Sequence, residues 1–280
     1  MNLLDGKQAK AKILESLKEK TNKLDTRLGF VVIQIGEDPA SDIYNNQKEK
    51  MAHFLNYDFR NIKLEETVSE EEVIGLINTL NNDDTVDGIL VQMPIPKSLN
   101  AKRIQNAIHP LKDVDGLTDV NAGKLVHDND TLVPCTPAGI LDLLNLNNIE
   151  VDGKNVVIIG RSNLVGKPLA TLLSNHNATV TLCHSKTSNL KEYTRLADIL
   201  IVAIGKPNFI TKDYVKDGSV VIDVGINRLE NNKLCGDVDF DSVAPIVSYI
   251  TPVPGGVGPM TVAHLAKNIY KAHILRTKQL

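Results

Sequence analysis

The chain has 280 residues, of which 42% are hydrophobic and 23% charged, and its formal net charge is −3. This length accommodates one large domain or two α/β domains with real hydrophobic cores, and no basic tract indicates nucleic acid as a partner. The N-terminus lacks the apolar core of a signal peptide, and no uncharged apolar run reaches the ~18 residues of a membrane span. We therefore expect a cytoplasmic protein that does not associate with membranes.

The first half of the chain alternates apolar runs with helical spacing, after an amphipathic surface helix expected near the N-terminus. Ser41 is expected to cap the second helix, and Ser69-x-x-Glu72 is a capping box at the start of the third. The β-α-β-α-β-α order predicts a parallel sheet with right-handed crossovers. The expected strands are 28–36, 57–64 and 86–93, and the helices between and after them are 41–55, 69–83 and 101–110.

The same pattern restarts in the second half, so the predicted fold class is α/β with two α/β domains flanking a cleft. A polar, turn-rich segment over 113–137 separates the two halves, and we place the boundary near residue 119. The segment 259–280 is predicted to be one amphipathic helix that packs back on the first domain. The domains are thus 1–118 with that helix, and 119–258. The strands expected in the second are 155–160, 178–183, 198–205 and 219–225.

A strand, a glycine turn and a helix are predicted over 156–173, the arrangement of a Rossmann-like dinucleotide-binding unit. A helix N-terminus offers free N–H groups and a positive dipole end to phosphate. The spacing Gly160-x5-Gly166 lacks a middle glycine, so the pyrophosphate is expected farther from the turn, near the side chains of Arg161 and Ser162. The alternative is that both glycines only permit close packing of strand on helix.

The end of the next strand bears on the choice of cofactor. NAD enzymes usually place an acidic residue there for the ribose 2′-hydroxyl, but this strand is followed by His184-Ser185-Lys186-Thr187, without a carboxylate. Hydroxyl and amine donors, together with Arg161, suit a 2′-phosphate. The sequence therefore favours NADP over NAD, and the alternative for His184 and Lys186 is an ordinary exposed loop.

Tyr44 and Lys48 are four residues apart, so both project from one face of the helix at 41–55. From spacing alone, a surface lysine beside a packing tyrosine explains them better than a catalytic pair. Gln92 lies at the carboxyl end of a predicted parallel strand, where α/β proteins bind ligands. Because the helix with Lys48 begins past the end of the first strand, Lys48 and Gln92 could meet above the sheet.

Two loops are further candidates for ligand contacts. Lys112-Asp-Val-Asp-Gly116 places two carboxylates two residues apart, so at most one faces a given site if the loop is extended. Turn capping is the alternative for both. The Pro/Gly-rich loop over 251–261 can contact a ligand through backbone groups, or can be a plain connector. Cys135, Cys183 and Cys235 lack metal-ligand spacing, so neither a disulfide framework nor a metal site is expected.

In these motifs the sequence resembles the bifunctional methylenetetrahydrofolate dehydrogenase/methenyltetrahydrofolate cyclohydrolase family. The matching pieces occur in the family's order over nearly the whole chain, and the only departure noted is Met93, where the family usually has leucine, a swap that conserves volume. The pieces are Tyr44-x-x-x-Lys48, VQMPIP (91–96), KDVDG (112–116), PCTP (134–137), GRSNLVGKP (160–168), HSKT (184–187), DVGIN (223–227), GDVDF (236–240) and TPVPGGVGPMT (251–261).

The resemblance implies an NADP-dependent enzyme, a homodimer, that oxidises 5,10-methylenetetrahydrofolate to the methenyl form and hydrolyses that to 10-formyltetrahydrofolate. Lys48 would be the central catalytic residue, Gln92 would hydrogen-bond it, Tyr44 would stack on the folate ring system, and Asp115 would bind the pterin. Further implied substrate contacts are Val91, Met93, Pro254, Gly255, Gly256, Val257 and Gly258. The implied NADP contacts are Gly160, Arg161, Ser162, Ser185 and Ile226.

Three other functions fit part of the sequence. A monofunctional methylenetetrahydrofolate dehydrogenase would share all these motifs, because hydrolysis depends on small changes around Lys48. A regulator that binds nucleotide without catalysis is disfavoured, since Tyr44, Lys48, Gln92 and Asp115 are retained together. A dehydrogenase of amino or hydroxy acids would need a clamp for the substrate carboxylate, typically arginine, and the first domain offers no convincing candidate.

Overall fold

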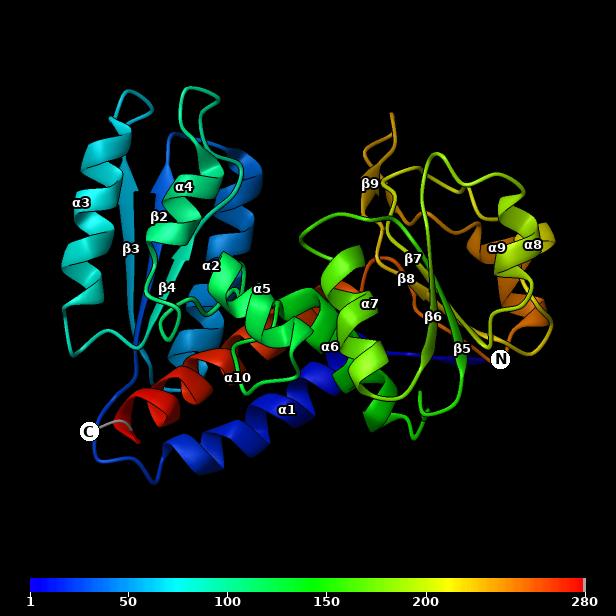
Figure 1. Ribbon diagram of the computed structural model, residues 1–280, viewed down its shortest axis with the longest axis horizontal. Coiled ribbons are helices and arrows are strands. Elements are labelled where there is room, and N and C mark those ends of the chain that lie inside the picture. The colour runs from blue at the N-terminus through cyan, green and yellow to red at the C-terminus, as the bar shows by residue number, and fades with distance from the viewer. Residues whose placement is uncertain (279–280) are drawn as a thin grey trace. The chain divides into compact units, whose positions relative to one another are not determined.

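The chain folds into two compact units, which we name by their sheets (Figure 1). The structure is a computed structural model that describes residues 1–278, apart from the side chains of residues 39, 40 and 43. The three-stranded unit comprises Lys12–Cys135 and Val262–Leu280, and the six-stranded unit comprises Met1–Ala11 and Thr136–Thr261. Two long helices, α1 (Gly6–Thr21) and α10 (Val257–Thr277), contribute residues to both units.

The three-stranded unit is built on a parallel sheet with the order β3-β2-β4. The central strand is an apolar run that is buried along its whole length, as expected when both faces of a parallel sheet are covered. Phe30 and Val32 pack on the side of α2 and α10, whereas Val31 and Ile33 pack on the side of α3 and α4. The strands are β2 (Gly29–Ile35), β3 (Asp58–Leu64) and β4 (Gly88–Val91).

The helices of this unit begin at side-chain caps. The capping box of Ser69 and Glu72 is present at α3. The cap of α2 is Asp38, not Ser41 as expected from the sequence, because Pro39 occupies the first turn and the Asp38 carboxylate accepts from the Ser41 N–H at 2.9 Å. The helices are α2 (Pro39–Phe54), α3 (Glu70–Asn81), α4 (Ala101–Ala107) and α5 (Asp119–Val126).

The last helix completes the core of the three-stranded unit. Ala266, Ile269 and Ala272 of α10 are fully buried and belong to the same apolar cluster as Phe30 and Met51. Asn268 donates from Nδ2 to the carbonyl oxygens of Val114 (2.9 Å) and Val133 (2.8 Å). These contacts place the segment up to Cys135 in this unit, whereas the boundary expected from the sequence lies near residue 119.

The six-stranded unit holds a parallel sheet with the order β1-β11-β8-β7-β5-β6. Its strands are β1 (Asn2–Leu3), β5 (Asn155–Ile159), β6 (Thr179–Cys183), β7 (Ile199–Val202), β8 (Val220–Asp223) and β11 (Tyr249–Ile250). A hairpin, β9 (Asn227–Arg228) with β10 (Leu234–Cys235), follows β8, and the helices are α6 (Cys135–Leu146), α7 (Gly166–Asn175), α8 (Leu190–Thr194) and α9 (Phe240–Val243), with 3-10 turns at Lys212–Tyr214 and Ala244–Ile246. Within residues 1–278, no helix is both long and apolar enough to cross a membrane.

Candidate active site

Lys48 lies on α2 and is buried, with 9% of its surface exposed. Its ammonium nitrogen, Nζ, donates to Gln92 Oε1 and, at 3.3 Å, to Asn45 Oδ1. Gln92 directly follows β4, and its backbone N–H donates to the Ile33 carbonyl at 2.8 Å, which extends the parallel ladder by one residue. The carboxyl end of the sheet therefore brings Lys48 and Gln92 together.

Burial makes the Lys48 amine more acidic than an ordinary lysine. It lowers the pKa of Lys48 from 10.5 to about 8, because a charged ammonium loses hydration inside the protein. The charge of Asp115 acts in the opposite direction and favours the ammonium. Burial raises the pKa of the neighbouring Cys135 thiol well above its usual value, so this thiol stays protonated near neutral pH. Burial likewise raises the pKa of Asp115, and the neighbouring Asp113 adds to this effect while Lys48 opposes it. An amine with this pKa exchanges a proton readily near neutral pH.

The two carboxylates of 112–116 have different surroundings. Asp113 is fully buried and accepts from the Thr118 N–H at 2.8 Å, from Asn121 Nδ2 at 2.9 Å and from Gln105 Nε2 at 3.1 Å. These bonds hold the start of α5, so Asp113 has a structural role. Asp115 is only partly exposed and interacts electrostatically with Lys48, which leaves it as the acid of this loop that can meet a ligand.

The remaining expected substrate residues differ in exposure. Tyr44 on α2 has 44% of its surface exposed and Met93 has 43%, whereas Val91 is buried in the sheet. Both exposed side chains are thus accessible to a flat ligand. The expected residues from the Pro/Gly-rich loop, 254–258, belong to the six-stranded unit; Pro254 is exposed, and Gly256 and Val257 are buried at the start of α10.

Sequence reasoning missed two amide side chains near Lys48. Asn45 is 4% exposed and Gln34 is 2% exposed, and Asn45 Nδ2 donates to Gln34 Oε1 at 2.8 Å. A signal for Gln34 existed, because it is the only polar side chain in the apolar run of β2. Buried polar groups of this kind need partners, and the partner of Asn45 on its other side is Lys48 itself.

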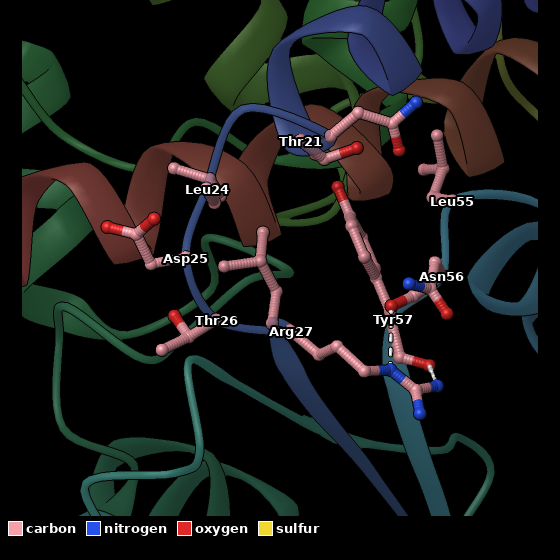
Figure 2. Close-up of a pocket in the computed structure, with 10 residues that line it drawn as sticks. Thr21, Leu24, Asp25, Thr26, Arg27, Leu55, Asn56 and Tyr57 are labelled. Carbon is pink, nitrogen blue, oxygen red and sulfur yellow. Dashed lines mark hydrogen bonds between the residues drawn. The ribbon is translucent and has the colours of Figure 1, made fainter.

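A separate cavity of about 270 Å³ lies at the amino ends of β2 and β3, away from the carboxyl ends where Lys48 and Gln92 meet (Figure 2). Arg27 lines it, but the guanidinium donates to the carbonyl oxygens of Asn56 and Tyr57, each at 3.1 Å. These bonds engage the arginine with backbone, and the amino ends of parallel strands are not where α/β proteins place ligands. The Lys48 region is therefore the better candidate site.

The glycine turn of the six-stranded unit joins β5 to α7 and fits the phosphates of a dinucleotide. Gly160 has φ +119°, and a Cβ atom there would lie 2.1 Å from the Ala203 carbonyl oxygen, so the turn requires glycine. No side chain caps α7, whose N-terminal N–H groups favour anions. Ser162 Oγ accepts from the Val165 N–H at 3.1 Å. Arg161, Ser162, Ser185 and Ile226 are all exposed.

Two buried carboxylates shape the loops at the ends of β7 and β8. Asp237 accepts from the N–H groups of Ile204 (2.7 Å), Gly205 (3.0 Å) and Lys206 (2.8 Å), and Asp223 accepts from that of Val238 at 2.9 Å. They explain why acidic residues occur in the segments 223–227 and 236–240: they order backbone next to Ile226. Among residues 1–278, no group of three His, Cys, Asp or Glu side chains is arranged to hold a metal ion.

Comparison with protein families matches both parts of the chain. Residues 4–115 match the tetrahydrofolate dehydrogenase/cyclohydrolase catalytic domain, and residues 134–277 match the NAD(P)-binding domain of the same name. These ranges contain Lys48 and the glycine turn, respectively.

Similar proteins and structures span the full chain. The bifunctional protein FolD of Campylobacter hominis is 54% identical, with all of both chains covered, and that of Agathobacter rectalis is 50% identical, with 97% of this chain and 98% of its own covered. The crystal structure of FolD from Campylobacter jejuni has a TM-score of 0.96 at 47% identity, with 99% of each chain covered. The FolD structure from Trypanosoma brucei, described as a complex with NADP and an inhibitor, has a TM-score of 0.93 at 33% identity, covering 99% of this chain and 98% of that one. The chain therefore belongs to the tetrahydrofolate dehydrogenase/cyclohydrolase family.

Proposed function

We propose that Lys48 is the catalytic residue of both reactions for which this family is named. The chain is an NADP-dependent enzyme that oxidises 5,10-methylenetetrahydrofolate to 5,10-methenyltetrahydrofolate and hydrolyses that product to 10-formyltetrahydrofolate. The observation that supports the role of Lys48 is its environment: a buried amine, held by amide oxygens, with a pKa of about 8. Such a group is uncharged in roughly one molecule in ten at pH 7, whereas an ordinary lysine is almost wholly charged there.

The oxidation needs little from the protein beyond binding and electrostatics. NADP, when bound, accepts the hydride that leaves the methylene carbon. The methenyl product is a cation, and an uncharged Lys48 amine stabilises its formation better than an ammonium because two positive charges repel each other strongly at a buried site. Gln92 and Asn45 hold the amine through their oxygens and carry no charge themselves.

In the hydrolysis, Lys48 acts as a general base and then as an acid. Water attacks the amidinium carbon of the methenyl group while the Lys48 amine takes one of its protons. The C–N5 bond then breaks, and the new ammonium returns a proton to N5, which gives 10-formyltetrahydrofolate with the second proton released to solvent. Proton transfer of this kind contributes ~100–10,000-fold to rate.

The other expected site residues remain part of this proposal. Tyr44 stacks on the folate ring system, and Asp115 binds the amino and ring N–H donors of the pterin. Val91 and Met93 contact the substrate, as do residues of the segment 254–258. Arg161 and Ser185 bind the 2′-phosphate of NADP because both offer donors and no carboxylate follows β6, while Gly160, Ser162 and Ile226 contact the rest of the cofactor.

A coupled assay tests the two activities separately. Purified protein is given methylenetetrahydrofolate with NADP or NAD, and the reduced cofactor and the methenyl group are followed by their own absorbances. We expect reduction of NADP and decay of the methenyl signal faster than in buffer. Cofactor reduction with a methenyl signal that decays only at the buffer rate would instead identify a monofunctional dehydrogenase.

The hydrolysis rate is expected to rise with pH and to level off above about pH 8. The reason is that the folded-state pKa of Lys48 is about 8, so each unit of pH below this value reduces the uncharged amine about tenfold. The measurement is the decay of supplied methenyltetrahydrofolate without NADP at a series of pH values, after subtraction of the buffer rate. A rate independent of pH from 6 to 9 would contradict the assignment of Lys48 as the base.

We also propose that the enzyme is a cytoplasmic homodimer. This assembly is implied by the resemblance in the motifs, and the molecular mass of one chain is 30.7 kDa. Sedimentation equilibrium on the purified protein distinguishes a dimer from a monomer.

A further inference from the structure

The Lys48 amine has two side-chain acceptors, and both are amide oxygens. Gln92 Oε1 comes from the end of β4, and Asn45 Oδ1 comes from the preceding turn of α2 at 3.3 Å. An uncharged amine has two N–H donors and one lone pair, whereas an ammonium has three donors. Two oxygen acceptors therefore match the donors of the uncharged amine and leave its lone pair pointing away from both amides.

The direction of the Asn45 amide is fixed by a row of hydrogen bonds behind it. Asn45 Nδ2 donates to Gln34 Oε1 at 2.8 Å, and Gln34 Nε2 donates to Asp42 Oδ1 at 3.2 Å and to the Gly36 carbonyl at 3.4 Å. A carboxylate only accepts hydrogen bonds. Gln34 must therefore turn its NH2 group to Asp42 and its oxygen to Asn45, which in turn leaves the Asn45 oxygen facing Lys48.

The Gln92 amide is fixed in the same sense from the other side. Its Nε2 donates to the Met93 carbonyl at 2.6 Å, and a backbone carbonyl also only accepts. Both amides that meet Lys48 thus present oxygen because an acceptor holds their nitrogen. Gln34 and Asn45 are nearly inaccessible to solvent, so water cannot readily substitute for a lost partner.

We propose that Asn45, oriented by Gln34 and Asp42, is a positioning residue that directs the lone pair of Lys48 toward the reacting carbon. This inference rests on the proposed role of Lys48 as the base. Gln92 alone would let the amine rotate about its single hydrogen bond. The second acceptor removes that freedom, because two fixed N–H directions determine the direction of the lone pair.

The charged groups around this row set the conditions of a test. Asp115 and Cys135 are the titratable groups that interact with Lys48, and Lys63 and Asp38 are those that interact with Asp42. Hydrogen bonds from Gln34 and Lys63 hold the pKa of Asp42 below its usual value. The carboxylate therefore stays ionised over the pH range of the assay. The direction of the hydrogen bonds from Asn45 through Gln34 to Asp42 does not change with pH.

The experiment compares Asn45→Leu and Asn45→Asp with Asn46→Leu, a control at the exposed neighbouring position. Hydrolysis of methenyltetrahydrofolate is measured from pH 6 to 9 without NADP. For Asn45→Leu we expect a plateau kcat reduced ~10-fold, the effect of one misplaced hydrogen bond, with KM nearly unchanged and the pH midpoint lowered because an acceptor of the ammonium is lost. For Asn45→Asp the added negative charge moves the midpoint upward. The control retains both quantities.

Asp42→Asn is a second variant, at a partly exposed position in the first turn of α2. Its amide can donate as well as accept, so only the 3.4 Å hydrogen bond to the Gly36 carbonyl still orients Gln34. We expect a several-fold lower plateau kcat, with a small decrease in the unfolding temperature because the exposed ion pair with Lys63 is lost. Wild-type kcat and midpoint in all variants would overturn the inference. A lower kcat in Asn45→Leu at an unchanged midpoint and with a reduced unfolding temperature would overturn it too, because that result indicates packing alone. A wild-type enzyme without hydrolysis would instead contradict the proposed function.

Discussion

Replacing Lys48 with methionine is expected to abolish hydrolysis of methenyltetrahydrofolate while NADP binding survives. Methionine fills a similar space without the amine, so the water loses its base, and a loss of ~100–10,000-fold is expected. Gln92 Oε1 and Asn45 Oδ1 lose their shared donor, so some loss of stability accompanies the change. The measurement is single-turnover decay of the methenyl absorbance, together with titration of NADP by fluorescence.

Lys50→Met is the matched control, because Lys50 lies on the same helix and is exposed. This variant should hydrolyse the substrate at the wild-type rate. Full hydrolysis by Lys48→Met would remove Lys48 from the mechanism, whereas loss of NADP binding together with hydrolysis would point to misfolding.

Replacing Gly160 with alanine is expected to abolish NADP binding and to destabilise the six-stranded unit. The new Cβ would lie 2.1 Å from the Ala203 carbonyl oxygen, which is backbone and cannot swing aside, and φ is +119°. Overpacking and the unfavourable φ together cost about 3 kcal/mol or more. The turn must move to relieve the contact, and with it the N-terminus of α7. Urea unfolding and an NADP titration measure the two effects.

Gly153→Ala separates the clash from the backbone strain. Gly153 also has a positive φ, +68°, and lies in the same unit just before β5, but a Cβ atom at this position would have no neighbouring atom within 4 Å. We expect a loss of about 1–2 kcal/mol from the left-handed conformation alone, with NADP affinity retained. Equal effects of the two substitutions would show that close packing at Gly160 is unimportant for the cofactor.

Most of the sheet structure could be predicted from the sequence, because each central strand is an apolar run bounded by polar turns. The capping box at Ser69 and the helix after the glycine turn were also predicted correctly, because short sequence motifs indicate them. Helix α5 was not, since its segment is polar and its start depends on Asp113, which accepts from Thr118 and Asn121. Strand β1 has only two residues and is defined by its pairing with β11. A segment this short has no hydrophobic periodicity from which a strand could be predicted.

The candidate site could be predicted only in part, for a similar reason. Topology alone indicated that Lys48 and Gln92 could approach, because both follow the carboxyl ends of parallel strands. The role of Asn45 depends on which amide group faces which neighbour, and this is decided by the carboxylate of Asp42, which acts on Asn45 through Gln34 of β2. The orientation of one amide group depends on that of the next, and no spacing of residues in the sequence indicates such a dependence. The cap of α2 was wrongly predicted at Ser41, although an aspartate directly before a proline is a pattern that fits a helix start.

The position of α10 affects the order in which the two units can fold during synthesis. Its residues from Val262 onward fill the core around Phe30, so the nascent three-stranded unit lacks a central layer while the six-stranded unit is being synthesised. This core can therefore be completed only after α10 has left the ribosome. The nascent chain must keep the apolar face of β2 from aggregating during that interval, so the three-stranded unit completes its folding after the strands of the six-stranded unit have been synthesised.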